Sequence, residues 1–189
     1  MVRAGAHACT DITGFGFLGH AYEMAAGSGM TLVIDSHRVP VEKKALELAQ
    51  EGIIPGGAYN NRGYLQDDVE MGAGVSLELS DVLYDPQTAG GLLISLPEHK
   101  APELLRQLEE FTGDARLVGY VKPFDGKSIV VKEKAFGLLS DPTAKRDCLF
   151  YPLLICKKPR PVRGFLRIER GKCGQMAARR PLQKLEKVA

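Results

Sequence analysis

Residues 10–20 read TDITGFGFLGH, and the interpretation of this stretch decides the fold. Gly14, Gly16 and Gly19 match the G-x-G-x-x-G spacing of the turn between the first strand and the first helix of dinucleotide-binding domains. Asp35 lies 21 residues after Gly14, about where such a domain places the acid that contacts the ribose. This interpretation predicts a doubly wound parallel sheet.

The residues before the glycines argue against a dinucleotide site. The first strand of such a sheet is buried on both faces and reads as a near-continuous apolar run. Here, in contrast, Thr10, Asp11 and Thr13 are polar. An unpaired carboxylate buried in a central strand would be strongly destabilising. We therefore disfavour NAD-type binding, which would depend on Asp35.

With Asp11 included, the same stretch suits a phosphate. The turn at Thr13, Gly14 and Gly16 precedes a helix, so that backbone N–H groups and the helix dipole favour an anion. The Asp11 carboxylate can hold Mg²⁺, because this ion takes one or two carboxylates together with substrate phosphates. The competing explanation is that Asp11 or Thr13 only caps the helix, which is preferred when the motif is considered alone.

A second polar turn, DPQTAGG, occupies residues 85–91 and again joins an acid, a threonine and glycines. A Gly-Gly pair allows the backbone to approach a ligand or another segment closely. Taken alone, this turn is an ordinary connection into the strand that follows. The residues that the two turns offer to a ligand are Asp11, Thr13, Gly14, Gly16, Asp85, Gln87, Thr88, Gly90 and Gly91, with Asp11 as the metal ligand.

The pattern of apolar residues predicts an α+β fold, with helices layered on a mixed, mostly antiparallel sheet. We expect helices at 16–26, 40–50 and 101–111, strands at 31–34, 75–79 and 92–96, and a long loop at 53–74 with at most one short helix. Residues 116–121 and 128–131 are expected to pair as a hairpin around Asp125-Gly126. Because a hairpin interrupts the alternation of strand and helix, a doubly wound sheet is disfavoured.

The charge distribution divides the chain of 189 residues near residue 134. Residues 1–134 carry 12 Lys and Arg against 19 Asp and Glu, whereas residues 135–189 carry 13 against 4. We predict one domain over 1–134 and a basic, proline-punctuated extension over 135–189 that is irregular or foreign to the domain, for example through a shifted reading frame. Such an extension could bind nucleic acid, but a solvated segment is preferred.

The remaining composition is typical of a cytoplasmic protein. No apolar run is long enough to cross a bilayer, and the first residues lack a secretory signal. The four cysteines show neither zinc-ligand spacing nor a disulfide framework, so that reduced thiols are expected. They are Cys9, Cys148, Cys156 and Cys173.

Taken together, HACTDITGFGFLGHAYEMA at 7–25, PGGAYNNRGYL at 55–65 and VLYDPQTAGGLLISLP at 82–97 resemble the C-terminal domain of the selenophosphate synthetase (selenide, water dikinase) family. The resemblance covers about residues 7–132. Relatives with the same architecture are aminoimidazole ribonucleotide synthetase, thiamine-monophosphate kinase and a hydrogenase maturation factor. Ala89 departs from the family pattern, where a serine is expected.

The resemblance implies an α+β unit that closes over an ATP site built mainly by an N-terminal domain. The family converts ATP, selenide and water into selenophosphate, AMP and phosphate, and its members are expected to be homodimers without a membrane partner. Asp11 matches the aspartate that contributes to Mg²⁺ on the ATP phosphates, and Gly14 and Gly16 match the adjacent turn. The 85–91 motif is expected near the active-site cleft, with no defined catalytic step.

Two features depart from the family. We find no counterpart of its N-terminal half, with a reactive cysteine or selenocysteine and a nearby lysine, and Cys9 is not that residue, so that a packing role is expected for it. Residues 135–189 match nothing in the family. We therefore assign no catalytic residue and expect the chain alone to be catalytically incompetent. The alternatives are another ATP-using member of the superfamily, or a protein that binds nucleic acid through its basic tail.

Overall fold

The sheet at the centre of the molecule is mixed and mostly antiparallel. In this computed structural model, which describes residues 2–135 and 151–156, seven strands lie in the order β1-β4-β7-β5-β2-β6-β3. They are β1 Ala8–Asp11, β2 Met30–Asp35, β3 Val69–Met71, β4 Leu92–Ser95, β5 Arg116–Pro123, β6 Ile129–Lys132 and β7 Tyr151–Cys156. Among the strands of the described residues, only the pairs β2–β6 and β3–β6 are parallel. The predicted α+β class is confirmed.

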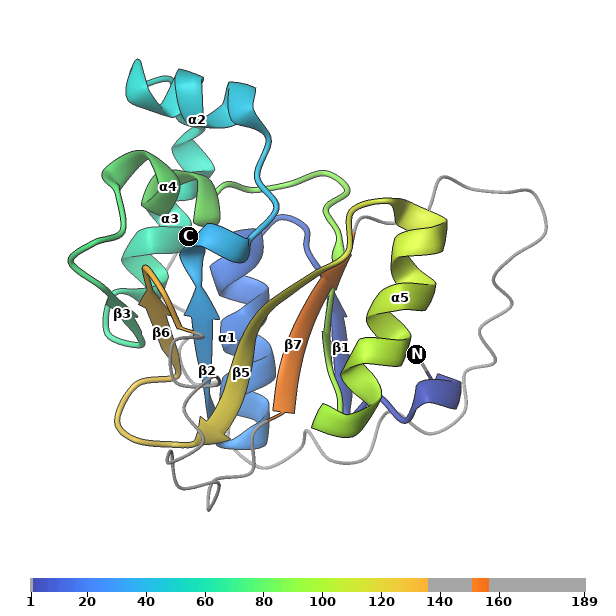
Figure 1. Cartoon of the computed structure of the whole chain (residues 1–189). Helices are drawn as coiled ribbons and strands as arrows, with labels where there is room; N and C mark the ends of the chain where they lie inside the picture. Colours follow the sequence, from blue (N-terminus) through green and yellow to red (C-terminus); the bar gives the residue numbers. More distant parts are fainter. Residues whose placement is uncertain (1, 136–150, 157–189) are drawn as a thin grey trace.

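Helices cover both faces of this sheet. They are α1 Gly16–Ser28, α2 Lys43–Gln50, α3 Gly56–Leu65, α4 Leu77–Leu83 and α5 Ala101–Thr112, with 3-10 turns at Val2–Ala4, Ser36–Arg38 and Glu98–Lys100. Figure 1 shows α1 behind the sheet, α5 in front of it, and α2, α3 and α4 gathered at one end. Among the described residues, none of the helices combines the length and the apolar character needed to cross a membrane.

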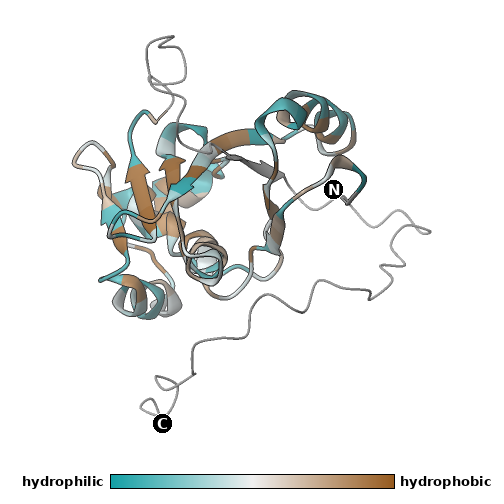
Figure 2. Ribbon diagram, turned by 90° about the horizontal axis from the view of Figure 1, so that it is seen from below, coloured by the Kyte–Doolittle hydropathy of each residue, from teal (hydrophilic) through white to brown (hydrophobic). Residues whose placement is uncertain are grey.

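The core follows from the alternation of side chains along the strands. Neighbouring residues of β4 point to opposite faces: Leu93 packs in the cluster that contains residues of α1, and Ile94 packs against α5. In β2, Val33 faces away from the α1 layer and joins a third cluster with Tyr120 and Val130. Figure 2 shows the hydrophobic colouring concentrated on the strands, with hydrophilic colouring on much of the outer helices.

The elements with strong local signals agree with the sequence. The helix expected at 16–26 is α1, and it ends at Gly29, whose φ of 65° is the left-handed conformation that glycine tolerates best. The strands expected at 31–34 and 92–96 are β2 and β4, and the helix expected at 101–111 is α5. The helix expected at 40–50 begins only at Lys43, and its N-cap residue Glu42 has an extended backbone.

The predicted hairpin is wrong, because β2 lies between its two strands. β5 pairs antiparallel with one edge of β2, and β6 pairs parallel with the other. The turn at Asp125-Gly126 crosses the beginning of β2, where the buried Thr31 donates its hydroxyl to the Lys127 carbonyl. Asp125 and Gly126 lie in the connection between β5 and β6, but the register of these strands depends on β2, about 90 residues upstream.

The long loop predicted at 53–74 and the strand predicted at 75–79 are also wrong. Residues 56–65 form the ten-residue helix α3, and Val69–Met71 forms β3. Val75 and Ser76 precede α4, and the Ser76 hydroxyl accepts a hydrogen bond from the Leu79 N–H at 3.3 Å. This serine N-cap, with Glu78 in the first turn, is a sequence signal for a helix that the strand interpretation missed.

Six residues of the basic extension differ from the prediction of an irregular segment. Tyr151–Cys156 forms β7, which pairs antiparallel with β4 on one side and β5 on the other. The rest of the extension, including Cys148 and Cys173, lies outside the described residues. The domain boundary near residue 134 stays a prediction.

Candidate functional site

The two polar motifs lie against each other at the end of β1. The Gly90 N–H donates to the Ile12 carbonyl at 2.8 Å, and the Ile12 N–H donates to the Gly91 carbonyl at 2.9 Å. A third backbone bond joins the Gln87 N–H to the Thr13 carbonyl at 3.0 Å. Residues 11–16 and 85–91 therefore form one surface, here called the paired-motif face.

Glycines make this close approach possible. A Cβ atom on Gly90 would lie 2.6 Å from the Ile12 carbonyl oxygen, and one on Gly16 would lie 2.7 Å from the Tyr84 carbonyl oxygen. Gly16 also has a φ of 70°, which is unfavourable for residues with a side chain. Gly14, in contrast, has open space where a Cβ would be, and it is exposed. Gly16 and Gly90 thus serve the contact between the motifs, whereas Gly14 faces outward.

Helix α3 holds the two motifs together. The Asn61 side-chain amide donates to the Gly14 carbonyl at 3.1 Å and to the Tyr84 carbonyl at 2.9 Å. A Cβ on Gly57, also in α3, would meet the Pro86 ring at 2.9 Å. The sequence interpretation missed Asn61 because it placed this segment in a loop.

The side chains of the first motif differ in their surroundings. Asp11 is exposed at the end of β1, and Thr13 is half-buried. The Thr13 hydroxyl lies 3.0 Å from Nε2 of His20, so that Thr13 does not cap α1, whose N-cap is Phe15 without a side-chain capping bond. His20 is buried, although it lies early in α1 next to the exposed turn. Cys9 is exposed, which contradicts its expected packing role.

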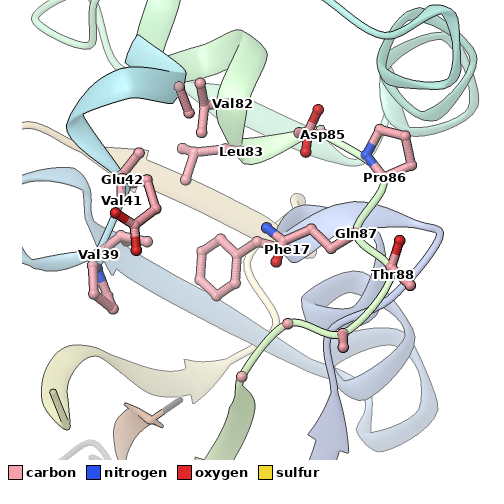
Figure 3. A pocket seen from close by; sticks show the side chains of 15 residues that line it. Phe17, Val39, Val41, Glu42, Val82, Leu83, Asp85, Pro86, Gln87 and Thr88 are labelled. Atoms are coloured by element: carbon pink, nitrogen blue, oxygen red, sulfur yellow. The ribbon is translucent and has the colours of Figure 1, made fainter. Parts of the chain in front are cut away.

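A pocket of about 580 Å³ adjoins the paired-motif face through residues 85–91. Figure 3 shows Phe17 at its centre, with Asp85, Gln87 and Thr88 on one side and Glu42 on the other. Residues 39–42, of which 40–42 were predicted to be helical, form the wall opposite the second motif. The pocket combines an apolar floor with carboxylate, amide and hydroxyl groups at its rim.

The Asp85 carboxyl is the titratable group of the second motif. It is half-buried, and burial raises its pKa above the ordinary value for aspartate. An ionised Asp85 is therefore less stable in this position than in water, and a cation or a hydrogen-bond donor from a ligand would relieve that cost.

Arg62 is held by an ion pair with Asp81 and does not offer a free cation to a ligand. Its guanidinium donates to the buried carboxylate of Asp81 and, at 3.3 Å, to the Ser80 hydroxyl. The same group lies 5.2 Å from the centre of the Tyr84 ring. Arg62 therefore ties α3 to α4.

The residues present can supply part of the ligand set of a metal ion that phosphate oxygens and water also hold, but not a complete set. Within the described part of the chain, no group of three or more His, Cys, Asp or Glu side chains could hold a metal ion. Asp11 supplies one exposed carboxylate, which matches the one or two carboxylates that Mg²⁺ uses when phosphate oxygens and water complete its shell.

The sheet excludes the dinucleotide arrangement. β1 is an edge strand antiparallel to β4, and three strands separate it from β2. A dinucleotide fingerprint needs these two strands to be parallel neighbours. Asp35 at the end of β2 is buried, and its carboxylate accepts hydrogen bonds from the backbone N–H groups of His37 and Ala135.

Comparison with known proteins assigns the chain to a family, and this agrees with the α+β fold described above. Residues 1–132 match the family model of the AIR synthase related protein, C-terminal domain, and the chain belongs to that family. The curated relatives described below are named selenide, water dikinase, which confirms the resemblance to the C-terminal domain of selenophosphate synthetase.

Three of these relatives show the extent of the match. The protein of Clostridium botulinum (strain Eklund 17B / Type B) is 54% identical over 126 residues, 67% of this chain and 36% of the relative. That of Caldanaerobacter subterraneus is 49% identical over 133 residues, 70% of this chain and 38% of the relative. That of Treponema denticola is 41% identical over 136 residues, 69% of this chain and 38% of the relative. The match therefore spans little more than a third of these relatives.

Proposed function

We propose that this chain supplies the C-terminal part of an ATP-dependent selenophosphate synthetase, which converts ATP, selenide and water into selenophosphate, AMP and phosphate. The observation that carries the proposal is the paired-motif face, where backbone hydrogen bonds join residues 11–16 to residues 85–91. Relatives named selenide, water dikinase support the choice of reaction.

In this proposal Asp11 contributes one carboxylate to Mg²⁺ on the ATP phosphates, and the turn at Thr13, Gly14 and Gly16 approaches the phosphates with its backbone. When bound, Mg²⁺ would neutralise phosphate charge, which is the main requirement of phosphoryl transfer besides positioning. Asp85, Gln87 and Thr88 present polar groups at the rim of the adjoining pocket. Gly90 and Gly91 allow the second motif to approach the first.

The remaining catalytic groups belong to the part of the family that this match does not cover. The chain alone is therefore expected to be inactive, and the active species is a homodimer, in the cytoplasm, in which each copy is completed by an N-terminal domain.

Reconstitution tests the proposal. The N-terminal portion of the Clostridium botulinum relative, up to its matched region, is purified together with this chain, and selenophosphate formation from ATP and selenide is measured. Activity should require both parts, and Asp11→Asn should lower it about 100-fold, the order of magnitude for loss of one preorganised electrostatic group. Asp67→Asn, at an exposed carboxylate after α3, is the matched control and should retain activity.

Two results would contradict the proposal. Robust turnover by the isolated chain would show that no further part is needed. Full activity of the Asp11→Asn variant in the reconstituted enzyme would remove the proposed role of this carboxylate.

A further inference from the structure

A chain of three polar side chains runs from the paired-motif face along α1. The Thr13 hydroxyl lies 3.0 Å from Nε2 of His20, and Nδ1 of the same ring lies 3.0 Å from Oε2 of Glu23. The His20 side chain is 10% exposed, whereas that of Glu23 is 54% exposed. The imidazole thus connects a surface carboxylate to a hydroxyl in the candidate site.

The neighbours of His20 hold the series Thr13–His20–Glu23 in place. The Phe15 ring lies 5.5 Å from the imidazole, centre to centre. The Thr13 carbonyl accepts bonds from the Gly16 and Gln87 N–H groups, so that the backbone that carries the hydroxyl is held by both motifs. The backbone position of Thr13 is therefore fixed by both motifs, and its hydroxyl is oriented by the contact with His20.

The direction of the hydrogen bonds follows from the groups involved. An ionised carboxylate only accepts, so that of the two neutral tautomers of His20, Glu23 favours the one with its proton on Nδ1. Nε2 is then an acceptor, and the Thr13 hydroxyl must donate to it. The oxygen lone pairs of Thr13 remain available for a donor from outside.

We propose that His20 and Glu23 are positioning residues, which act through Thr13 to present its hydroxyl oxygen as an acceptor to water bound to Mg²⁺. This inference rests on the proposed function, because Mg²⁺ enters through Asp11, two residues away. Mg²⁺ usually keeps several water ligands, and these waters need acceptors of fixed orientation. The three residues thereby connect the Glu23 carboxylate, on α1, to the paired-motif face.

The first test does not depend on activity. The nitrogen-15 spectrum of the imidazole groups is recorded on the full chain, with His20 assigned by its absence in His20→Phe. We expect Nδ1 protonated and Nε2 unprotonated near neutral pH, and loss of this preference in Glu23→Ala and Thr13→Val. His7, His37 and His99 serve as internal references. A protonated Nε2 in the wild-type chain would overturn the proposal.

The second test is a double-mutant cycle in the reconstituted enzyme. Thr13→Val and His20→Phe should each raise KM for MgATP by about fivefold to tenfold, the effect of one lost hydrogen bond. The double variant should be no worse than Thr13→Val, because His20 acts through that hydroxyl. Thr13→Ser should restore KM to within about twofold, as it keeps the hydroxyl.

Multiplied effects in the double variant, with KM raised about 25-fold or more, would overturn the proposal, because residues that act independently add in free energy. A melting temperature lowered by both variants while KM is unchanged would also overturn it, in favour of a purely structural role. If the wild-type reconstitution is inactive, the proposed function fails, and the imidazole spectrum still decides whether His20 has the predicted tautomer.

Discussion

Gly90 is the residue at which the two motifs come closest. In Gly90→Ala the new Cβ would lie 2.5 Å from Oε1 of Gln87 and 2.6 Å from the Ile12 carbonyl oxygen, and the backbone oxygen cannot move without disturbing β1. We expect a loss of about 1–3 kcal/mol in the free energy of unfolding, typical of overpacking, measured by urea denaturation. Gly14→Ala, where nothing lies within 4 Å of the new Cβ, is the control. Equal stability of the two variants would contradict the close approach.

Asp85 gives a prediction about pH. Because burial raises its pKa, the folded state holds this proton more tightly than the unfolded chain, so that ionisation of Asp85 destabilises the fold as pH rises. Asp85→Asn should therefore raise the melting temperature at pH 7, and this gain should shrink as pH falls from the raised pKa of Asp85 toward the ordinary pKa of aspartate. A gain in melting temperature that stays the same at lower pH would show that the charge of Asp85 is not its cause.

At the scale of elements, α3 connects the paired motifs although its sequence forms helices poorly. Glycine and asparagine make up half of its ten residues. The helix is instead supported by tertiary contacts: Ala58 and Leu65 are buried in the main core, and Asn61 bonds to both motifs. This is the physical reason why a pattern of local propensities predicted a loop.

Asn61→Ala tests this connection. The change removes the hydrogen bonds to the Gly14 and Tyr84 carbonyls, and we expect a loss of about 1–2 kcal/mol in the free energy of unfolding. Asn60→Ala is the matched control, because Asn60 is the exposed neighbour in the same helix. In the reconstituted enzyme Asn61→Ala should also raise KM for MgATP. Equal stability of the Asn61→Ala and Asn60→Ala variants would show that α3 does not hold the motifs together.

At the scale of the whole molecule, β7 makes the sheet continuous by pairing with β4 and β5. A chain that ends at residue 150 would leave two strand edges open in the middle of the sheet, and such edges promote aggregation. We expect this truncation to lose hydrogen-exchange protection in β4 and β5, whereas a chain that ends at residue 156 should keep it. Equal protection in both would favour the predicted domain boundary near residue 134.

The sequence alone determined the features that depend on near neighbours. The acids, hydroxyls and glycines of residues 11–16 and 85–91 stood out as two motifs, and the spacing of apolar residues predicted α1 and α5, because helix formation and turns are governed by interactions over a few residues. The resemblance to a family also rested on these stretches.

Only the tertiary structure decided which distant segments meet. The insertion of β2 between β5 and β6, the burial of His20 against Thr13, and the bond from Asn61 to both motifs join residues whose contacts exist only once the sheet is formed. Strand order is chosen by the burial of whole faces, in which each residue contributes a small share, so that no short pattern in the sequence specifies it.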